Sequence, residues 1–444
     1  MNMENLLAIS PTELVQWLAA RNIRRFHLAL DQGSGLMMAS HQELKPLADF
    51  INSDTRDFMG HEGLFFQISE KHDTLQGAFV HRTCRGQAAG GVRYWSYDTV
   101  EDYLRDGMRL AKGMTRKNAL AGLWWGGGKG VMAHNPDQVK TDPGHREDIY
   151  QDYGRLLSDL RGCYVTAEDV GTHVVDMANV FSTTRFTTCI PEALGGSGNP
   201  SAPTARGVVS GMEAALEFAG MGTLHGKTVA VQGMGNVGAP LIGFLFEKGV
   251  SRVVAADINP ELADNLRAGL EGHLQPDQEL ETRIVEIGNH DILAEECDIV
   301  APCATGAILN PETIPGIRAR IVCGASNNQL EDAARDDAAL SEAGIIYVPD
   351  FLTNRMGIVN CANEAYGYVN NDEFIERHLE RTWEHSVFKT TLQVLRDSQS
   401  SDVAPARTAM NLADELSLQP HPVFGHRGVR IIDSLVNDRW FDHA

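Results

Sequence analysis

The hydrophobic positions of this sequence change their spacing along the chain, from strand-like runs near the N-terminus to helical and alternating patterns further on. The early apolar runs predict strands at Phe26–Leu30, Leu36–Ser40, Gly63–Ile68 and Gly77–His81. We interpret residues 1–65 as an N-terminal extension and residues 66–200 as the first α/β domain.

From Asp98 the apolar spacing becomes that of an amphipathic helix. Asp98 is the expected N-cap, because Glu101 stands three residues later. We expect the helix to end near Lys117, since Gly122 and the glycines at 126–128 interrupt any continuation. The residues that share its apolar face are Val100, Tyr103, Leu104, Met108, Ala111 and Met114.

After residue 200, strand-like and helix-like segments alternate, which is typical of a doubly wound parallel sheet. The Gly-, Ser- and Pro-rich segment Leu194–Pro203 is the expected hinge before it. We predict an α/β protein with a C-terminal Rossmann-type dinucleotide-binding domain at 201–365 and a helical segment at 366–444 that packs back on the first domain. The expected strands of the Rossmann-type domain are Thr228–Val231, Val253–Ala256, Ile284–Ile287, Ile299–Ala301, Ile321–Cys323 and Ile345–Val348.

The composition narrows the function classes. The 444 residues are 43 % hydrophobic and 22 % charged, as in globular proteins with a sizeable core. A formal net charge of −21 repels phosphate backbones, so nucleic acid is not an expected partner. The N-terminus lacks a signal-peptide pattern, and no apolar run approaches the ~18 residues of a membrane helix. The seven cysteines form no CxxC pair, so we expect a cytoplasmic protein with neither a disulfide framework nor a metal site.

A strand, a glycine-rich turn and a helix follow one another at residues 227–248. Gly233, Gly235 and Gly238 stand at the GxGxxG positions, which allow a tight turn, close approach of the backbone to a pyrophosphate, and close helix–strand packing. A glycine turn without a ligand is the alternative, but the order of strand, turn, helix and second strand disfavours it. The expected cofactor-binding residues of this loop are Gly233, Met234, Gly235, Asn236, Val237 and Gly238.

Asp257 ends the second expected strand of this domain. An acid at that place meets the adenosine ribose hydroxyls and repels a 2′-phosphate, so NAD is the expected cofactor. Arg252 or a neighbouring loop leaves NADP open as the alternative.

Two lysines flank a second glycine-rich stretch. Lys129 follows three glycines at the start of an apolar segment, and we expect it to have little water around it. Desolvation disfavours the charged form of a lysine, which suits proton transfer or activation of water. Lys117 can stay charged and bind a carboxylate. The alternative is that both are surface lysines beside a glycine turn.

Over residues 85–370 the sequence resembles the Glu/Leu/Phe/Val amino-acid dehydrogenases. Its residues between the two lysines are closer to those of the leucine and phenylalanine branch. The two lysines also lie twelve residues apart, as they do across that family. The matching motifs are Gly90-Gly-Val-Arg-Tyr-Trp95, GMTRKNA and GGGKG around the lysines, Thr166-Ala-Glu-Asp-Val-Gly-Thr172, Gly198-Asn-Pro200, Val231-Gln-Gly-Met-Gly-Asn-Val-Gly238, Ala301-Pro-Cys-Ala304, Gly324-Ala-Ser-Asn-Asn-Gln-Leu330 and Val348-Pro-Asp350.

The resemblance implies a role for single residues. Lys117 would hold the substrate α-carboxylate, and Lys129 would polarise the carbonyl oxygen and activate water. Asp169 would exchange a proton with the substrate nitrogen; an exposed loop carboxylate is the alternative. It further implies that Ala89, Gly90 and Asn328 contact the substrate and that Thr204, Ala304 and Asn327 contact the cofactor. The roles of Asn327 and Asn328 can also be the reverse of these. It also implies that residues 66–200 form a substrate and oligomerisation domain of a homo-oligomer.

Two departures from the family pattern bear on specificity. Glutamate-specific members carry a lysine just before GGxR, whereas Ala88 and Ala89 stand here, so a buried γ-carboxylate would lack a partner. Ala89, Trp124 and Trp125 point to an apolar, aliphatic or aromatic substrate. Arg355 lies where the family usually has a small residue, and we interpret it as solvent-facing, with a substrate or cofactor contact as the alternative.

The sequence therefore predicts NAD-dependent, reversible oxidative deamination of an apolar L-amino acid to its 2-oxo acid and ammonia. A hydride acceptor, a carboxylate anchor, a base for the amine and a group that stabilises the tetrahedral intermediate are the parts this reaction needs. Two other functions stay open: another Rossmann oxidoreductase acting on 2-hydroxy acids, and a non-catalytic NAD-binding regulator.

Overall fold

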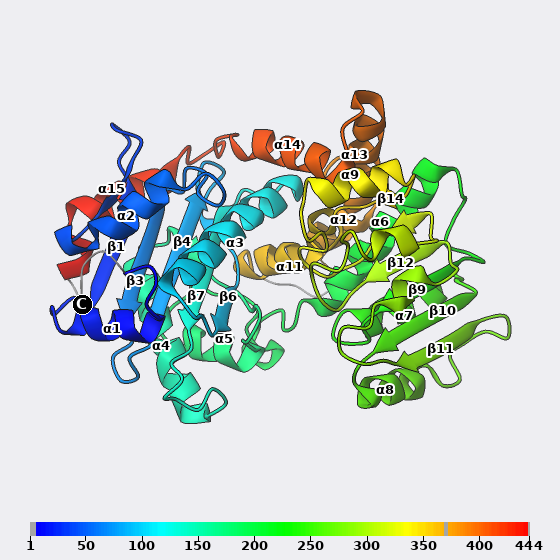
Figure 1. The fold of residues 1–444 in the computed structure, drawn as a ribbon, viewed down its shortest axis with the longest axis horizontal. Helices are drawn as coiled ribbons and strands as arrows, with labels where there is room; N and C mark the ends of the chain where they lie inside the picture. Colours follow the sequence, from blue (N-terminus) through cyan, green and yellow to red (C-terminus); the bar gives the residue numbers. More distant parts are fainter. Residues whose placement is uncertain (1–5, 368–371, 443–444) are drawn as a thin grey trace. The chain divides into compact units, whose positions relative to one another are not determined.

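A computed structural model describes residues 6–367 and 372–442, and these residues form two compact units (Figure 1). The first unit comprises Met1–Asn199, Cys361–Tyr368 and Ala413–Ala444, and the second comprises Pro200–Asn360 and Val369–Leu412. The chain passes from one to the other between Asn199 and Pro200, inside the segment Leu194–Pro203. In the described part of the chain, no helix combines the length and the apolar character that crossing a membrane requires.

An eight-stranded mixed sheet forms the centre of the first unit, in the order β2-β1-β3-β4-β7-β5-β8 with β6 beside β7. Strands β1 to β4 and β7 pair antiparallel, whereas β5, β6 and β8 add parallel pairs. Residues 1–65 supply strands β1 and β2 and the first half of β3. The strand bounds are β1 Arg25–Leu30, β2 Met37–Ala39, β3 Gly63–Ile68, β4 Leu75–Arg82, β5 Ala88–Ala89, β6 Val92–Trp95, β7 Gly126–Ala133 and β8 Tyr164–Val165.

Helices pack against this sheet, and the apolar faces of α1, α2 and α3 share one core with strands β1, β3 and β4. Helices α11 and α14 contain residues of both units. The bounds of the helices in this unit are α1 Pro11–Ala19, α2 Lys45–Ser53, α3 Val100–Leu120, α4 Pro143–Asp159, α5 Val174–Phe181, α11 Met356–Ala365, α14 Pro405–Ser417 and α15 Arg427–Asn437, with 3₁₀ turns at Gln42–Leu44, Glu192–Leu194 and Trp440–Asp442.

The glycines before Lys129 were expected to interrupt a helix, and that prediction was wrong. They form the start of the central strand β7 instead. A β-carbon on Gly127 would collide with Thr115 of α3, and one on Gly128 would lie 2.7 Å from the ring of Tyr164. The glycines therefore let α3 and β8 approach the strand closely, a contact that local sequence signals do not reveal.

Two details of the α3 prediction are also wrong. The N-cap is Thr99, whose side-chain oxygen accepts the N–H of Asp102 at 3.1 Å, so Asp98 lies one residue before the cap. The helix continues past Lys117 to Leu120, because Gly122 is the first residue there with a left-handed φ, +67°.

The second unit is a six-stranded parallel sheet in the order β11-β10-β9-β12-β13-β14, which confirms the Rossmann-type, doubly wound fold. Val229 and Val231 of β9 face a core shared with α6 and α7, and Ala230 between them faces the opposite core with α9. This alternation covers both faces of the sheet with helices. The strand bounds are β9 Thr228–Gln232, β10 Arg252–Asp257, β11 Glu279–Ile284, β12 Ile299–Pro302, β13 Ile321–Val322 and β14 Ile346–Tyr347.

The third strand of this sheet was expected at Ile284–Ile287 and lies instead at Glu279–Ile284. It is an edge strand whose residues are half-buried or exposed, so it carries alternating polar side chains rather than an apolar run. The helix bounds in this unit are α6 Ser201–Ala219, α7 Gly238–Glu247, α8 Pro260–Leu270, α9 Arg335–Glu342, α10 Asp350–Thr353, α12 Glu373–Leu379 and α13 Val387–Ser401, with 3₁₀ turns at Asp291–Ala294 and Ile314–Gly316.

Candidate active site

Lys129 and Asp169 form a buried ion pair in the first unit. The Nζ of Lys129 lies 2.7 Å from Oδ1 of Asp169, and their side chains are 4 % and 17 % exposed. Lys129 projects from β7, and Asp169 follows β8 in a loop where Thr172 Oγ1 accepts the Asp169 N–H at 2.8 Å. Two residues that are forty positions apart in the sequence are thus brought into direct contact by the sheet.

The surroundings set the charge state of this pair. Burial lowers the pKa of Lys129, and the carboxylate of Asp169 opposes that effect. For Asp169, burial would raise the pKa, but the charges of Lys129 and Arg93 outweigh it and lower the pKa to about 2. Asp169 is therefore a carboxylate at neutral pH, and Lys129 loses its proton more readily than an exposed lysine.

Arg93 is a member of this site that the sequence reasoning missed. Its Nε donates to Oδ2 of Asp169 at 3.2 Å, and its Nη1 donates to Oδ2 of Asp106 at 3.0 Å. The available signal was its place in the Gly90–Trp95 motif, two residues after the glycine pair. A motif match alone does not say which side chain pairs with which.

Lys117, Gly90 and Ala89 lie near one another in the same unit. Lys117 is half-buried in the last turn of α3, and the next residue, Asn118, donates from Nδ2 to the carbonyls of Gly126 at 2.5 Å and Ala89 at 3.3 Å. These bonds fix the end of α3 onto β5 and β7. The carboxylate-anchoring role of Lys117 and the substrate roles of Gly90 and Ala89 stay predictions.

The glycine-rich loop of the second unit has the geometry expected of a dinucleotide site. Gly233 has a left-handed φ of +98°, and a β-carbon on Gly238 would collide with the Gly233 carbonyl. A β-carbon on Gly235 would meet no atom within 4 Å, so the space in front of that backbone is open. The loop leads into the N-terminus of α7, where the positive end of the helix dipole favours phosphate.

The other residues predicted for this site lie at the ends of β10 and β12 and in helix α6. Asp257, at the end of β10, accepts the Met234 N–H at 2.7 Å. Thr204, in the first turn of α6, donates from Oγ1 to the Pro200 carbonyl at 2.8 Å. Ala304 follows β12, is exposed, and has its β-carbon close to the place that a side chain on Gly233 would take.

Asn327 and Asn328 are both exposed after β13. Asn328 has a left-handed φ of +53° and donates its N–H to Oδ2 of Asp350 at 3.1 Å. Oδ1 of Asn327 accepts from Nδ2 of Asn354 at 2.9 Å. A non-glycine residue held at positive φ is a strained position of the kind that occurs at binding sites.

Arg355 does not face solvent, and that interpretation was wrong. Its side chain is 0 % exposed, and its Nη2 donates to the His385 carbonyl at 2.5 Å and to Thr390 Oγ1 at 3.1 Å. Arg355 therefore ties the segment after α10 to the segment that leads into α13. Its partners lie 30 and 35 residues further along the chain, so local polarity gave no sign of them.

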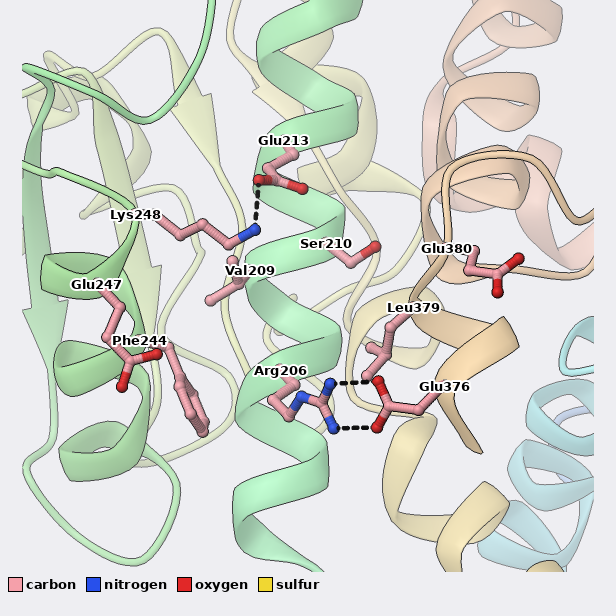
Figure 2. Close-up of a pocket in the computed structure, with 10 residues that line it drawn as sticks. All are labelled: Arg206, Val209, Ser210, Glu213, Phe244, Glu247, Lys248, Glu376, Leu379 and Glu380. Carbon is pink, nitrogen blue, oxygen red and sulfur yellow. Dashed lines mark hydrogen bonds and ion pairs between the residues drawn. The ribbon is translucent and has the colours of Figure 1, made fainter. Parts of the chain in front are cut away.

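Two of the cavities in the described part of the second unit differ in their relation to the predicted site. One, of about 450 Å³, borders the glycine-rich loop and is lined by Met234, Gly235 and Asn236 together with residues of α8. The other, of about 420 Å³, lies among α6, α7 and α12 (Figure 2). Ion pairs Arg206–Glu376 and Lys248–Glu213 border it, and its lining includes none of the residues predicted for the site.

Comparison with known proteins agrees with this arrangement. A sequence model described as "Glutamate/Leucine/Phenylalanine/Valine dehydrogenase" matches residues 195–416, and one described as "Glu/Leu/Phe/Val dehydrogenase, dimerisation domain" matches residues 66–186. Leucine dehydrogenase of Bacillus cereus is 39 % identical over 364 residues, which cover 79 % of this chain and 92 % of that protein.

Two further relatives extend the comparison. Valine dehydrogenase of Streptomyces coelicolor is 35 % identical over 346 residues, covering 77 % of this chain and 88 % of its own length. The crystal structure of L-tryptophan dehydrogenase from Nostoc punctiforme matches with a TM-score of 0.65 and 30 % identity, covering 80 % of this chain and 96 % of that chain. The resemblance found in the motifs is thus confirmed, and the chain belongs to the Glu/Leu/Phe/Val family of amino-acid dehydrogenases.

Proposed function

We propose that this protein catalyses the reversible, NAD-dependent oxidative deamination of an apolar L-amino acid to its 2-oxo acid and ammonia. The observation that carries the proposal is the buried contact between Lys129 and Asp169, with 2.7 Å between Nζ and Oδ1. A lysine with a lowered pKa and a carboxylate that is ionised at neutral pH form a pair of groups that can exchange protons at bonding distance.

Each residue of the first unit has a distinct part in this reaction. Lys117 binds the α-carboxylate as a point charge. Lys129 takes the proton of the water that attacks the substrate carbon and then stabilises the oxygen that becomes the carbonyl. Asp169 binds the substrate nitrogen and accepts a proton from the amino group before oxidation. It returns that proton to nitrogen as ammonia leaves, and both transfers run in reverse when ammonia enters. Burial of the Lys129–Asp169 pair strengthens these interactions by excluding water.

The residues of the second unit fit a nicotinamide dinucleotide. The open space at Gly235 and the N-terminus of α7 suit the pyrophosphate, and Asp257 suits a free ribose 2′-hydroxyl. Because a 2′-phosphate would meet the charge of Asp257, NAD is the proposed cofactor rather than NADP. When bound, it supplies the hydride acceptor that oxidation of the Cα–H bond requires.

We expect the amino-acid substrate to carry an apolar side chain. Ala88 and Ala89 of β5 are both 0 % exposed, and neither offers a charge to a side-chain carboxylate. The leucine, valine and tryptophan dehydrogenases among the relatives support aliphatic and aromatic substrates. A homo-oligomer is also proposed, because residues 66–186 match the family's dimerisation domain.

The test is a screen of NADH consumption with 2-oxo acids in the presence and absence of ammonia. We expect turnover with aliphatic or aromatic 2-oxo acids, only with ammonia, and weak turnover with 2-oxoglutarate. NADH consumption without ammonia would support the 2-hydroxy-acid alternative. Cofactor binding without turnover on any 2-oxo acid would support a non-catalytic regulator.

A further inference from the structure

Both oxygens of the Asp169 carboxylate are bound, and by different cations. Lys129 Nζ lies 2.7 Å from Oδ1, and Arg93 Nε donates to Oδ2 at 3.2 Å. Each carboxylate oxygen can accept a second hydrogen bond, so the substrate nitrogen can bind beside the cation that is already there. The oxygen held by Lys129 is the one that can change partner, because Lys129 itself exchanges a proton in the proposed reaction.

Arg93 is in turn fixed from its other side. Nη1 of Arg93 donates to both carboxylate oxygens of Asp106, at 3.0 and 3.3 Å. Asp106 lies on α3, is 10 % exposed, and also accepts from Tyr97 Oη at 2.7 Å and Arg109 Nη2 at 3.0 Å. A guanidinium held at two edges has little rotational freedom, so its Nε is aimed at Asp169 before any substrate arrives.

The charges along this line alternate: Lys129, Asp169, Arg93 and Asp106 are cation, anion, cation and anion, with side chains 4 %, 17 %, 20 % and 10 % exposed. Their sum is zero, so none of the four is an uncompensated buried charge. Removing one member leaves its neighbours unbalanced, and the charge state of Lys129 and Asp169 then changes.

We propose that Arg93 is the positioning residue of the site: held by Asp106, it keeps the Asp169 carboxylate oriented and ionised while Lys129 exchanges its proton. This inference rests on the function proposed above for Lys129 and Asp169. The bonds of Arg93 to acids run to Asp169 and Asp106, so in this role Arg93 acts through Asp169.

The electrostatics of the surroundings agree with this geometry. The charge of Arg93 lowers the pKa of both Lys129 and Asp169, whereas Asp106 raises that of Lys129. The other titratable groups that act on Asp169 from neighbouring elements are Tyr164 of β8 and Glu168 beside it. Burial raises the pKa of Tyr164 and raises that of Glu168 to about 7, and neither group carries the positive charge that Arg93 supplies.

Substitutions of Arg93 and of Asp106 should shift the pH dependence of the reaction in opposite directions. Arg93→Gln removes a positive charge, so the pH at which kcat/KM for oxidative deamination rises to half its maximum should move up by about one unit. Asp106→Asn removes a negative charge but keeps an acceptor for Arg93, so the same midpoint should move down. Arg93→Lys keeps the charge and loses the second bond, so it should retain the wild-type midpoint with a lower kcat. Arg109→Gln is the control, because Arg109 contacts Asp106 while 61 % exposed and should leave the midpoint unchanged.

A second measurement does not require turnover. Acetic anhydride reacts only with the deprotonated amine, so labelling of Lys129 across a pH series, read by mass spectrometry, reports its pKa. Lys71, whose side chain is 65 % exposed, serves as the reference in the same sample. The labelling midpoints of Arg93→Gln and Asp106→Asn should move in the same opposite directions as the kinetic midpoints.

The outcomes separate this inference from the proposed function. Midpoints that stay in place in both variants, or move in the same direction, overturn the positioning role even if the enzyme deaminates amino acids. If the wild type turns over no amino acid but the labelling midpoints diverge, the proposed function fails and the Arg93 network stands. Thermal unfolding of each variant identifies a folding defect, and Asp106→Asn carries the labelling test if Arg93→Gln does not fold.

Discussion

Oδ2 of Asp257 accepts the N–H of Met234 at 2.7 Å, so the acid at the end of β10 is bonded to the glycine-rich loop that follows β9. The two strands are neighbours in the sheet, with Ala256 opposite Gln232, and their carboxyl ends meet at one edge. The other oxygen of Asp257 accepts the Asn259 N–H at 3.0 Å. The residue predicted to bind the ribose therefore also holds the loop that is predicted to bind the pyrophosphate.

This double role predicts the effect of Asp257→Asn on cofactor choice. The amide can still accept from Met234 but no longer repels a 2′-phosphate, so the Kd for NADP should fall about tenfold relative to that for NAD. Fluorescence titration with both reduced cofactors measures the ratio. Asp264→Asn is the control, because the Asp264 side chain on α8 is 72 % exposed. An unchanged ratio in Asp257→Asn would remove the argument for NAD.

Lys129→Ala tests the reacting pair directly. We expect turnover to fall below detection, because the residue that exchanges a proton with water is gone and Asp169 keeps only Arg93. NAD affinity should stay within about twofold, since Lys129 and the glycine-rich loop belong to different units. Steady-state kinetics and cofactor titration measure both. Lys71→Ala, an exposed lysine of the same unit, should behave as wild type.

Lys117→Ala tests the carboxylate anchor. Loss of a charge-assisted bond to the substrate carboxylate should raise KM for the amino acid at least tenfold, with a smaller effect on kcat. An amine substrate analogue without the carboxylate should bind wild type and variant alike. If KM for the amino acid is unchanged, the carboxylate is bound elsewhere.

The structural elements around the candidate site that the sequence predicted well are those built from contiguous residues. The loop Gly233–Gly238, the helix after it and the acid at Asp257 follow one another within thirty residues, and each carries its own local signal. The parallel pairing of that unit follows from the alternation of strands and helices, whereas the order of its strands comes from the structure.

The parts that were missed depend on contacts between distant residues. Arg93 and Asp169 are 76 positions apart, so no spacing rule pairs them. The glycines of β7 looked like a helix breaker, because the close approach of Thr115 that they permit is a tertiary contact. Arg355 was assigned to solvent on residue type alone, whereas its buried partners come from the segment around α13.

Buried histidines in the first unit make its stability depend on pH. The rings of His61 and His81 lie 4.6 Å apart, and His61 Nε2 lies 2.9 Å from the Met108 carbonyl. Burial lowers the pKa of His61 to about 4 and that of His81 well below its usual value. Below about pH 6.5 the unfolded chain binds protons that the folded chain excludes, so the free energy of unfolding falls as the pH drops from about 6.5 toward 4.

His61→Gln should flatten this dependence, because glutamine keeps a donor for Met108 and does not titrate. Between neutral pH and pH 4, the free energy of unfolding of the wild type should fall by on the order of 3 kcal/mol more than that of the variant. This difference corresponds to the lowered pKa of His61. Urea unfolding at several pH values between about 7 and 4.5 measures the slope, and His273→Gln, at an exposed position after α8, should leave it unchanged. Parallel slopes for wild type and His61→Gln would mean that His61 is protonated in the folded protein, in conflict with its burial between α3 and β4.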